Sequence, residues 1–222
     1  ILSAGKAIEN ATGRKPSGFR GPGFSWSGDL ISVLKELGYR YDASTLPTWI
    51  GPLGRLYYFW KSDLTPEEKR DRKKLFGGLG EALPVKPYFW ALPGGERLLE
   101  LPVTTMPFFR VPIHFSYLLY LARYSEAAML AYLGTAVSLC RLTGTGLSFL
   151  LHPLDFLGAR EVPGLAFFPG MDIMKEKKQR TLAKVMDVLS ARFRLAPMDV
   201  YAETWAAGNG PAAVRSLGKK GT

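Results

Sequence analysis

A chain of 222 residues is long enough to bury its own core, and 47% hydrophobic with 22% charged residues excludes a disordered or fibrous protein. The net charge of +10 favours anionic partners, and nucleic acid, acidic glycans and lipid headgroups are all compatible with it. The single cysteine, Cys140, excludes an internal disulfide and lies in an apolar run, where we expect a small buried side chain rather than a nucleophile.

The beginning of the chain predicts alternating helices and strands. Helical spacing of apolar residues predicts the end of a helix over 1–11, stopped by Gly13, and a short strand follows over 18–20. Ser27 is suited to cap a second helix, after which we expect a strand over 39–43. The predicted apolar face of that helix consists of Leu30, Val33, Leu34 and Leu37. This alternation predicts parallel strands with helices packed outside them.

The next part of the chain is irregular and then forms a hairpin. Residues 44–64 are rich in Pro, Gly and aromatic side chains, which we interpret as a loop over a site. A capping box at Thr65 predicts a charged helix to about Phe76. Strands over 88–92 and 98–104 flank a Pro-Gly-Gly-Glu turn, and we interpret this hairpin as an insertion into a parallel sheet.

The second half predicts further helices and one buried strand. Two helices are expected over 114–122 and 125–142, followed by an apolar strand over 147–151. Residues 171–194 are amphipathic, with apolar side chains on one side and lysines and arginines on the other. Residues 208–222 predict a flexible basic tail, so that one α/β domain spans 1–207.

Two polar side chains stand at predicted strand ends beside Gly or Pro. Arg20 precedes a Gly-Pro-Gly turn and needs an anionic partner if its guanidinium points into the crevice at the strand end. His152 follows the apolar strand 147–151 and precedes Pro153, and a histidine titrating near neutrality suits general acid catalysis. Because parallel α/β folds place their sites at the carboxyl ends of strands, we expect both groups to share one pocket.

Four motifs in order, GFRGPGFS, LGYRYDAS, LLELPVTT and FLLHPLD, resemble the polysaccharide deacetylase family, the NodB-homology domain, over about residues 1–205. Arg20-Gly21-Pro22 with Phe24 is similar to the family's Arg-x-Pro motif, and Leu150-Leu151-His152 to its Leu-x-His motif. The resemblance implies a distorted (β/α) barrel, incomplete at its N-terminal side.

The resemblance also implies an enzyme that removes N-acetyl groups from a carbohydrate or polysaccharide. In the family a divalent metal, usually zinc, activates a water, an aspartate acts as base, and the late histidine protonates the leaving amine. His152 would be that acid, and Arg20 would orient the catalytic aspartate. In the substrate groove, the resemblance assigns binding roles to Pro22, Phe24, Leu150, Asp42 and Trp49, the last two at poorly matching spacing.

The chain departs from the family at its beginning. The family's metal and base come from an early Asp-Asp motif and an early His-x-x-x-His motif, and neither is present. With His152 assigned as the acid, the remaining histidine is His114, which we expect to be a structural or surface histidine, so we expect no metal ligands in this chain. A start inside a predicted helix, without methionine, favours a C-terminal fragment.

Two other functions stay open. A non-catalytic glycan-binding module would use the aromatic loop 49–60 to stack on sugars. An anion-surface binder would use the basic stretches 55–74 and 175–194, which we interpret instead as solvated helix faces. No nucleic-acid motif accompanies the charge, so we predict no nucleic-acid partner, although peripheral contact with an anionic membrane or a lipid-linked glycan is compatible with it.

We predict no transmembrane helix. The most apolar stretch, 117–142, is interrupted by Arg123, Glu126 and Arg141, so it lacks about 20 uninterrupted apolar residues. Cytoplasm and periplasm both remain open as the compartment.

Overall fold

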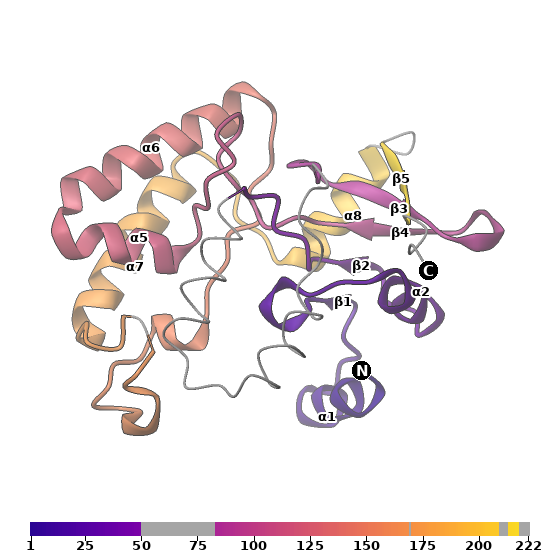
Figure 1. Ribbon diagram of the computed structural model, residues 1–222, viewed down its shortest axis with the longest axis horizontal. Coiled ribbons are helices and arrows are strands. Elements are labelled where there is room, and N and C mark those ends of the chain that lie inside the picture. Colours follow the sequence, from indigo (N-terminus) through magenta and orange to yellow (C-terminus); the bar gives the residue numbers. More distant parts are fainter. Residues whose placement is uncertain (50–82, 169, 209–212, 218–222) are drawn as a thin grey trace. The chain divides into compact units, whose positions relative to one another are not determined.

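The computed structural model describes residues 1–49, 83–168, 170–208 and 213–217 (Figure 1). Contacts divide the chain into two compact units. Unit 1 contains the described residues of 1–102 and of 196–222, and unit 2 those of 103–195. The predicted helix 65–76 and most of the predicted loop 44–64 lie outside the described residues.

Unit 1 is built on a mixed five-stranded sheet, which confirms the α/β class. Its strands are β1 (Gly18–Phe19), β2 (Tyr41–Asp42), β3 (Tyr88–Ala91), β4 (Arg97–Glu100) and β5 (Val214–Ser216). The order is β1-β2-β4-β3-β5, with β1, β2 and β4 parallel to one another and β3 antiparallel to β4. The predicted hairpin is part of this sheet, because β4 lies between β2 and β3.

Helices cover both faces of this sheet. α2 (Gly28–Glu36) packs Ile31 and Leu34 against the side chains of Tyr88, Trp90 and Leu98. α8 (Met198–Gly208) packs on residues of the opposite pleat, Phe89 and Leu99 among them. Alternate residues of a strand point to opposite faces, so both faces of β3 and β4 are buried, as expected for a sheet between helices.

The helix ends follow the predicted signals, and one predicted face differs. α1 (Leu2–Thr12) ends at Gly13, whose φ of 69° suits a residue without Cβ. The Ser27 hydroxyl accepts a hydrogen bond from the Leu30 amide at 3.1 Å and caps α2 as predicted. Val33, expected on the apolar face of α2, is exposed, while its neighbour Ile31 is fully buried.

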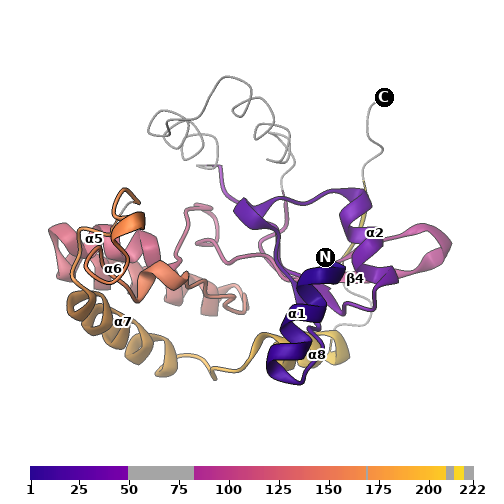
Figure 2. The same ribbon diagram turned by 90° about the horizontal axis from the view of Figure 1, so that it is seen from below.

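Unit 2 is a three-helix layer. Its helices are α5 (Phe115–Tyr124), α6 (Glu126–Leu142) and α7 (Lys175–Ser190), which lie side by side in Figures 1 and 2. They confirm the helices predicted over 114–122, 125–142 and within 171–194. Their shared core includes Phe115, Leu133 and Val185. Cys140 is fully buried, as expected, and burial raises the pKa of its thiol to about 11.

The strand predicted over 147–151 is wrong. This segment is extended, but its backbone makes only scattered bonds: Thr104 N donates to Ser148 O at 3.2 Å, and Phe115 N to Leu150 O at 3.2 Å. Ser148 N donates to the Thr104 hydroxyl at 2.7 Å instead of to a carbonyl. The Thr104 side chain therefore takes the place of a backbone carbonyl, and no regular series of backbone hydrogen bonds forms along this segment. His152 consequently follows an extended loop rather than a strand.

The C-terminal region also differs from the expected flexible tail. Val214–Ser216 form β5, which pairs in parallel with β3 through Phe89, Trp90 and Ala91. α8 precedes it. The pairing partner of β5 lies more than 100 residues earlier in the chain, so no local pattern could have indicated it.

Candidate functional sites in the two units

The Arg-Gly-Pro motif forms a tight turn directly after β1. Pro22–Phe24 is a short 3₁₀ turn, and Phe24 has a φ of 60°, which is uncommon for a residue with a bulky side chain. A Cβ at Gly21 would overlap the carbonyl oxygen of Ser25, so glycine is required there. The Gly21 amide donates to the Ser44 hydroxyl at 2.7 Å. This turn is therefore tied to the segment that follows β2.

Arg20 lies partly buried between this turn and the end of β2. Its Nε donates to the carbonyl oxygen of Ala43 at 2.9 Å. Burial lowers the pKa of Arg20, and the neighbouring Asp42 and Glu100 oppose that effect. A guanidinium stays charged in proteins, and among the described residues these two are the acidic groups whose charge acts on it.

Asp42 and Glu100 are opposite each other at the ends of two parallel strands. Asp42 ends β2, Glu100 ends β4, and the two are paired in register. Both are fully buried. The Ser44 hydroxyl donates to Asp42 Oδ1 at 2.6 Å. Glu100 accepts three hydrogen bonds, from Thr45 N at 3.0 Å and Thr45 Oγ1 at 2.6 Å on Oε1, and from Trp90 Nε1 at 3.0 Å on Oε2.

Burial dominates the electrostatics of this cluster. It raises the pKa of Asp42, and together with the adjacent Asp42 charge it raises the pKa of Glu100 to about 8. Burial and the charge of Glu100 also raise the pKa of Tyr88. Sequence reasoning did not single out Glu100. The available signal was an acidic residue directly after the apolar pair Leu98-Leu99.

His152 lies in unit 2, where a short turn fixes one edge of its ring. Its amide donates to Asp155 Oδ2 at 2.7 Å and begins the 3₁₀ turn Pro153–Asp155. Ser116 Oγ lies 3.2 Å from His152 Nδ1 and donates to Asp155 Oδ1 at 3.1 Å. Asp155 Oδ2 also lies 3.6 Å from Nδ1. The His152 side chain is 45% exposed and that of Asp155 is 6% exposed.

These contacts define the chemistry of the His152 ring. Because the single hydroxyl proton of Ser116 goes to Asp155, Ser116 Oγ is an acceptor toward His152, which assigns a proton to Nδ1. Nε2 is therefore the nitrogen that a substrate can meet. Burial would favour the neutral acid at Asp155, but hydrogen bonds from His152 and Ser116 outweigh it and lower the pKa of Asp155. The Asp155 carboxylate is therefore ionised and lies 3.6 Å from Nδ1 of the ring.

This arrangement is not a serine hydrolase triad. In such a triad the serine and the acid contact different nitrogens of the histidine ring. Here Ser116 and Asp155 are both on the Nδ1 side. Ser116 therefore orients His152 rather than serving as a nucleophile activated by it.

A buried lysine holds the turn that carries His152. Lys178 of α7 is 2% exposed, and its Nζ donates to the carbonyl oxygens of Leu154 at 2.8 Å and Leu157 at 2.6 Å. Burial lowers its pKa. The sequence predicted the lysines of this helix on its solvent side, and Lys178 is the exception because the two carbonyls need donors inside the protein.

The other candidates are divided between the units. Pro22, Phe24, Arg20 and Asp42 belong to unit 1, as does Trp49, which is 61% exposed. Leu150 belongs to unit 2, where it is buried. His114, before α5, is also buried, with its ring 4.6 Å from Tyr117 and 5.9 Å from His152. The expectation that Arg20 and His152 share one pocket stays a prediction.

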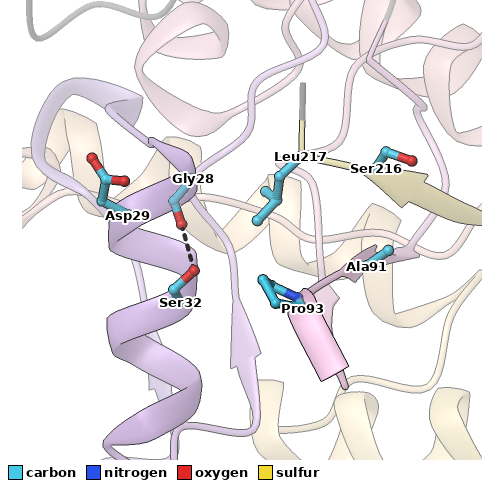
Figure 3. Close-up of a pocket in the computed structure, with 7 residues that line it drawn as sticks. All are labelled: Gly28, Asp29, Ser32, Ala91, Pro93, Ser216 and Leu217. Atoms are coloured by element: carbon cyan, nitrogen blue, oxygen red, sulfur yellow. Dashed lines mark hydrogen bonds between the residues drawn. The ribbon is translucent and has the colours of Figure 1, made fainter. Parts of the chain in front are cut away.

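A cavity of about 420 Å³ opens in unit 1 away from these residues. It lies between the N-terminal turn of α2 and the ends of β3 and β5, with Asp29, Ser32, Pro93 and Leu217 in its lining (Figure 3). The Ser32 hydroxyl donates to the Gly28 carbonyl of its own helix at 3.0 Å. The lining contains none of the predicted site residues.

Within the described ranges, no group of three or more His, Cys, Asp or Glu side chains is arranged to hold a metal ion. No helix among these residues combines the length and the apolar character needed to cross a bilayer. Comparisons with family models, with curated proteins and with solved structures give no match to this chain.

Proposed function

We propose that this chain is the C-terminal part of a hydrolase that removes N-acetyl groups from a carbohydrate or polysaccharide, with His152 as the general acid. The main support is the His152 site, where Ser116 and Asp155 hold Nδ1 and leave Nε2 for a ligand. The four ordered motifs that resemble polysaccharide deacetylases add to it. The proposal includes the finer fold, a distorted (β/α) barrel to which the parallel strands β1, β2 and β4 belong.

The proposed acid step follows from the hydrogen bonds around the ring. When the carbon–nitrogen bond of the N-acetyl group breaks, the amine nitrogen must gain a proton. The imidazolium form of His152 carries a proton on Nε2 and gives it to that nitrogen, leaving the neutral ring with its Nδ1 proton still directed at Ser116. The Asp155 carboxylate, 3.6 Å from Nδ1, keeps the ring oriented for the transfer. General acid catalysis of this kind contributes about 100-fold to 10,000-fold in rate.

The divalent metal that the resemblance implies does not fit the described residues, which hold no suitable ligand group. No step is therefore assigned to a metal within this chain. We propose that the metal and base motifs of the hydrolase belong to a segment outside these 222 residues.

Acetate release from N-acetylated glycans tests the acid role. In the full-length protein, His152→Ala should lower turnover by at least about 100-fold while the metal content stays unchanged, because His152 is proposed as acid and not as ligand. Asp187→Asn, an exposed change on α7, is the control and should keep full turnover. Unchanged turnover in His152→Ala would remove the proposed role.

A non-catalytic glycan-binding module is the second candidate, and one feature of α5 favours it. Tyr117, Tyr120 and Tyr124 are 39%, 61% and 72% exposed, and their spacing places them on one helix face. The rings of Tyr120 and Tyr124 are 5.4 Å apart. Exposed tyrosines offer an apolar ring face with a polar hydroxyl, which suits a sugar. The loop 49–60, first considered for this role, lies outside the described residues after Trp49.

Glycan titration separates the two candidates. The double change Tyr120→Ala/Tyr124→Ala should weaken binding of an N-acetylated oligosaccharide by about tenfold or more, since a stacked aromatic pair contributes on the order of 1 kcal/mol per ring. Leu142→Ala, an exposed apolar change at the end of α6, is the control. Binding without metal uptake or acetate release favours the module, and unchanged binding in the double variant excludes this tyrosine face.

A further inference from the structure

The ends of β2 and β4 bring two acidic side chains together where no water reaches them. Asp42 and Glu100 are paired in register, both are 0% exposed, and Asp42 Oδ2 has no hydrogen-bond partner among the described residues. Two like charges in contact cannot both be ionised in such surroundings. A hydrogen bond between two carboxyl groups also requires that one of them carries a proton.

We propose that Asp42 and Glu100 bind one proton between them at neutral pH, and that the single negative charge left on the pair positions the guanidinium of Arg20. This inference goes beyond the proposed deacetylation and does not depend on it.

The hydrogen bonds around the pair leave room for one proton. Asp42 Oδ1 accepts from Ser44, Glu100 Oε1 accepts twice from Thr45, and Glu100 Oε2 accepts from Trp90. With both acids ionised, Asp42 Oδ2 is buried and has no donor among the described residues. An unsatisfied buried acceptor is costly, and a proton between the two carboxyl groups supplies the missing hydrogen bond.

Among the residues that the structure describes, the charges that act on the pair balance one negative charge rather than two. Arg20, after β1, is the cation whose charge acts on both acids. Arg215 of β5 acts on Tyr88, and Asp199 of α8 acts on Tyr41 and adds a negative charge nearby. Burial raises the pKa of both tyrosines, so their phenols stay neutral. Within the described ranges, the charge of Arg20 therefore matches a pair that carries a single negative charge.

The Asp42–Glu100 pair is also connected to Arg20 by hydrogen bonds of the segment 43–45. Ser44 and Thr45, which donate to the two acids, directly follow Ala43, whose carbonyl oxygen accepts from Arg20 Nε at 2.9 Å. Ser44 Oγ further accepts from the Gly21 amide, next to Arg20. A change in the charge of the pair would therefore alter the surroundings of Arg20 both electrostatically and through these bonds.

The pH dependence has a defined sign. Because the pKa of Glu100 rises from an ordinary value of 4.5 to about 8, the folded protein binds more protons than the unfolded chain between these values. Stability is therefore fully present below the lower value and falls as the pH rises through the upper one. One bound proton corresponds to about a tenfold change in the unfolding constant per pH unit.

Asp42→Asn is the sharpest test, because it replaces the proton with an amide. The substituted side chain keeps an oxygen for the Ser44 bond and puts an N–H group where Oδ2 lacked a donor, so Glu100 can ionise without repulsion. The infrared band of a protonated carboxylic acid should be present in the wild type at pH 7 and absent in Asp42→Asn. Between about pH 5.5 and 7.5, the unfolding constant of the wild type should rise by up to about tenfold per pH unit relative to Asp42→Asn.

The Arg20 part of the proposal has its own readout. The Nε–H resonance of Arg20 should shift in the wild type with the same midpoint as the carboxylic acid band, and should not shift over that range in Asp42→Asn. Asp187→Asn, an exposed change in unit 2, should keep both wild-type responses. If the Nε–H resonance of Arg20 does not shift as the carboxylic acid band titrates, the positioning role is overturned.

Two results would overturn the shared proton. The first is a folded wild type without a carboxylic acid band at pH 7. The second is an Asp42→Asn variant with the same band and pH slope as the wild type. If that variant does not fold, the wild type alone tests the proposal. Its carboxylic acid band must disappear when the protein is unfolded at the same pH, because the two separated acids then ionise.

Discussion

Asp42 in unit 1 and Asp155 in unit 2 are both buried, at 0% and 5% exposure, and both accept a hydrogen bond from a nearby serine hydroxyl. Their pKa values nevertheless move in opposite directions. Burial raises the pKa of Asp42, which lies beside the acid Glu100. At Asp155 the hydrogen bonds from His152 and Ser116 outweigh burial, and the pKa is lowered. Burial outweighs the hydrogen bonds at Asp42, whereas the hydrogen bonds outweigh burial at Asp155, and this balance decides the direction in which each pKa moves.

This difference separates what the two sites can do. The unit 1 pair is sealed, so its proton serves to hold the strand ends and Arg20 in place. In unit 2 the ionised Asp155 sits behind a histidine whose side chain is 45% exposed, so the charge acts on a group that a substrate can reach. The proposed chemistry therefore belongs to His152, and a positioning role belongs to the buried pair.

The same substitution at the two aspartates should give opposite results at neutral pH. Asp155→Asn replaces an acceptor by an amide and weakens the bonds from His152 N and Ser116 Oγ, so we expect a loss of about 3 kcal/mol at pH 7. Asp42→Asn should cost little or even stabilise, because it supplies a missing donor. Urea unfolding of both variants at pH 7 measures the contrast.

The stability of the two variants at acid pH provides the control for this comparison. A carboxyl with a lowered pKa contributes stability that is present above its ordinary value of 3.8 and is lost as the pH falls through its value in the folded protein. The cost of Asp155→Asn should therefore shrink below pH 3.8. Equal costs at pH 7 for the two asparagine variants would contradict the assignment of a shared proton to the Asp42–Glu100 pair and an ionised carboxylate to Asp155.

Local signals in the sequence were enough for the helices but not for these sites. Gly13 and Ser27 mark the ends of α1 and α2, and Ser125 caps α6 through the Ala128 amide at 3.2 Å. Each of these signals involves residues within one turn, so it can be read along the chain.

The buried partners depend on contacts far apart in the sequence. Glu100 meets Thr45 across 55 positions, and Lys178 meets Leu154 across 24. The segment 147–151 has the apolar character of a strand, but a strand needs a neighbour to pair with, and here a threonine hydroxyl takes that place. His152 could be proposed from its motif, whereas Ser116 and Asp155 could be joined to it only in three dimensions.

Ser44 and Ser116 each donate to one of the two aspartates, and we expect their replacement to have the smallest effects on stability. Ser44→Ala should cost about 2 kcal/mol, because it leaves the buried Gly21 amide without its acceptor as well as removing a donor from Asp42. Ser116→Ala should cost about 1 kcal/mol, since water can reach this half-exposed site and replace the lost bonds. Thermal unfolding measures both changes. If Ser116→Ala cost more than Ser44→Ala, the expectation that water replaces the lost bonds at the unit 2 site would be wrong.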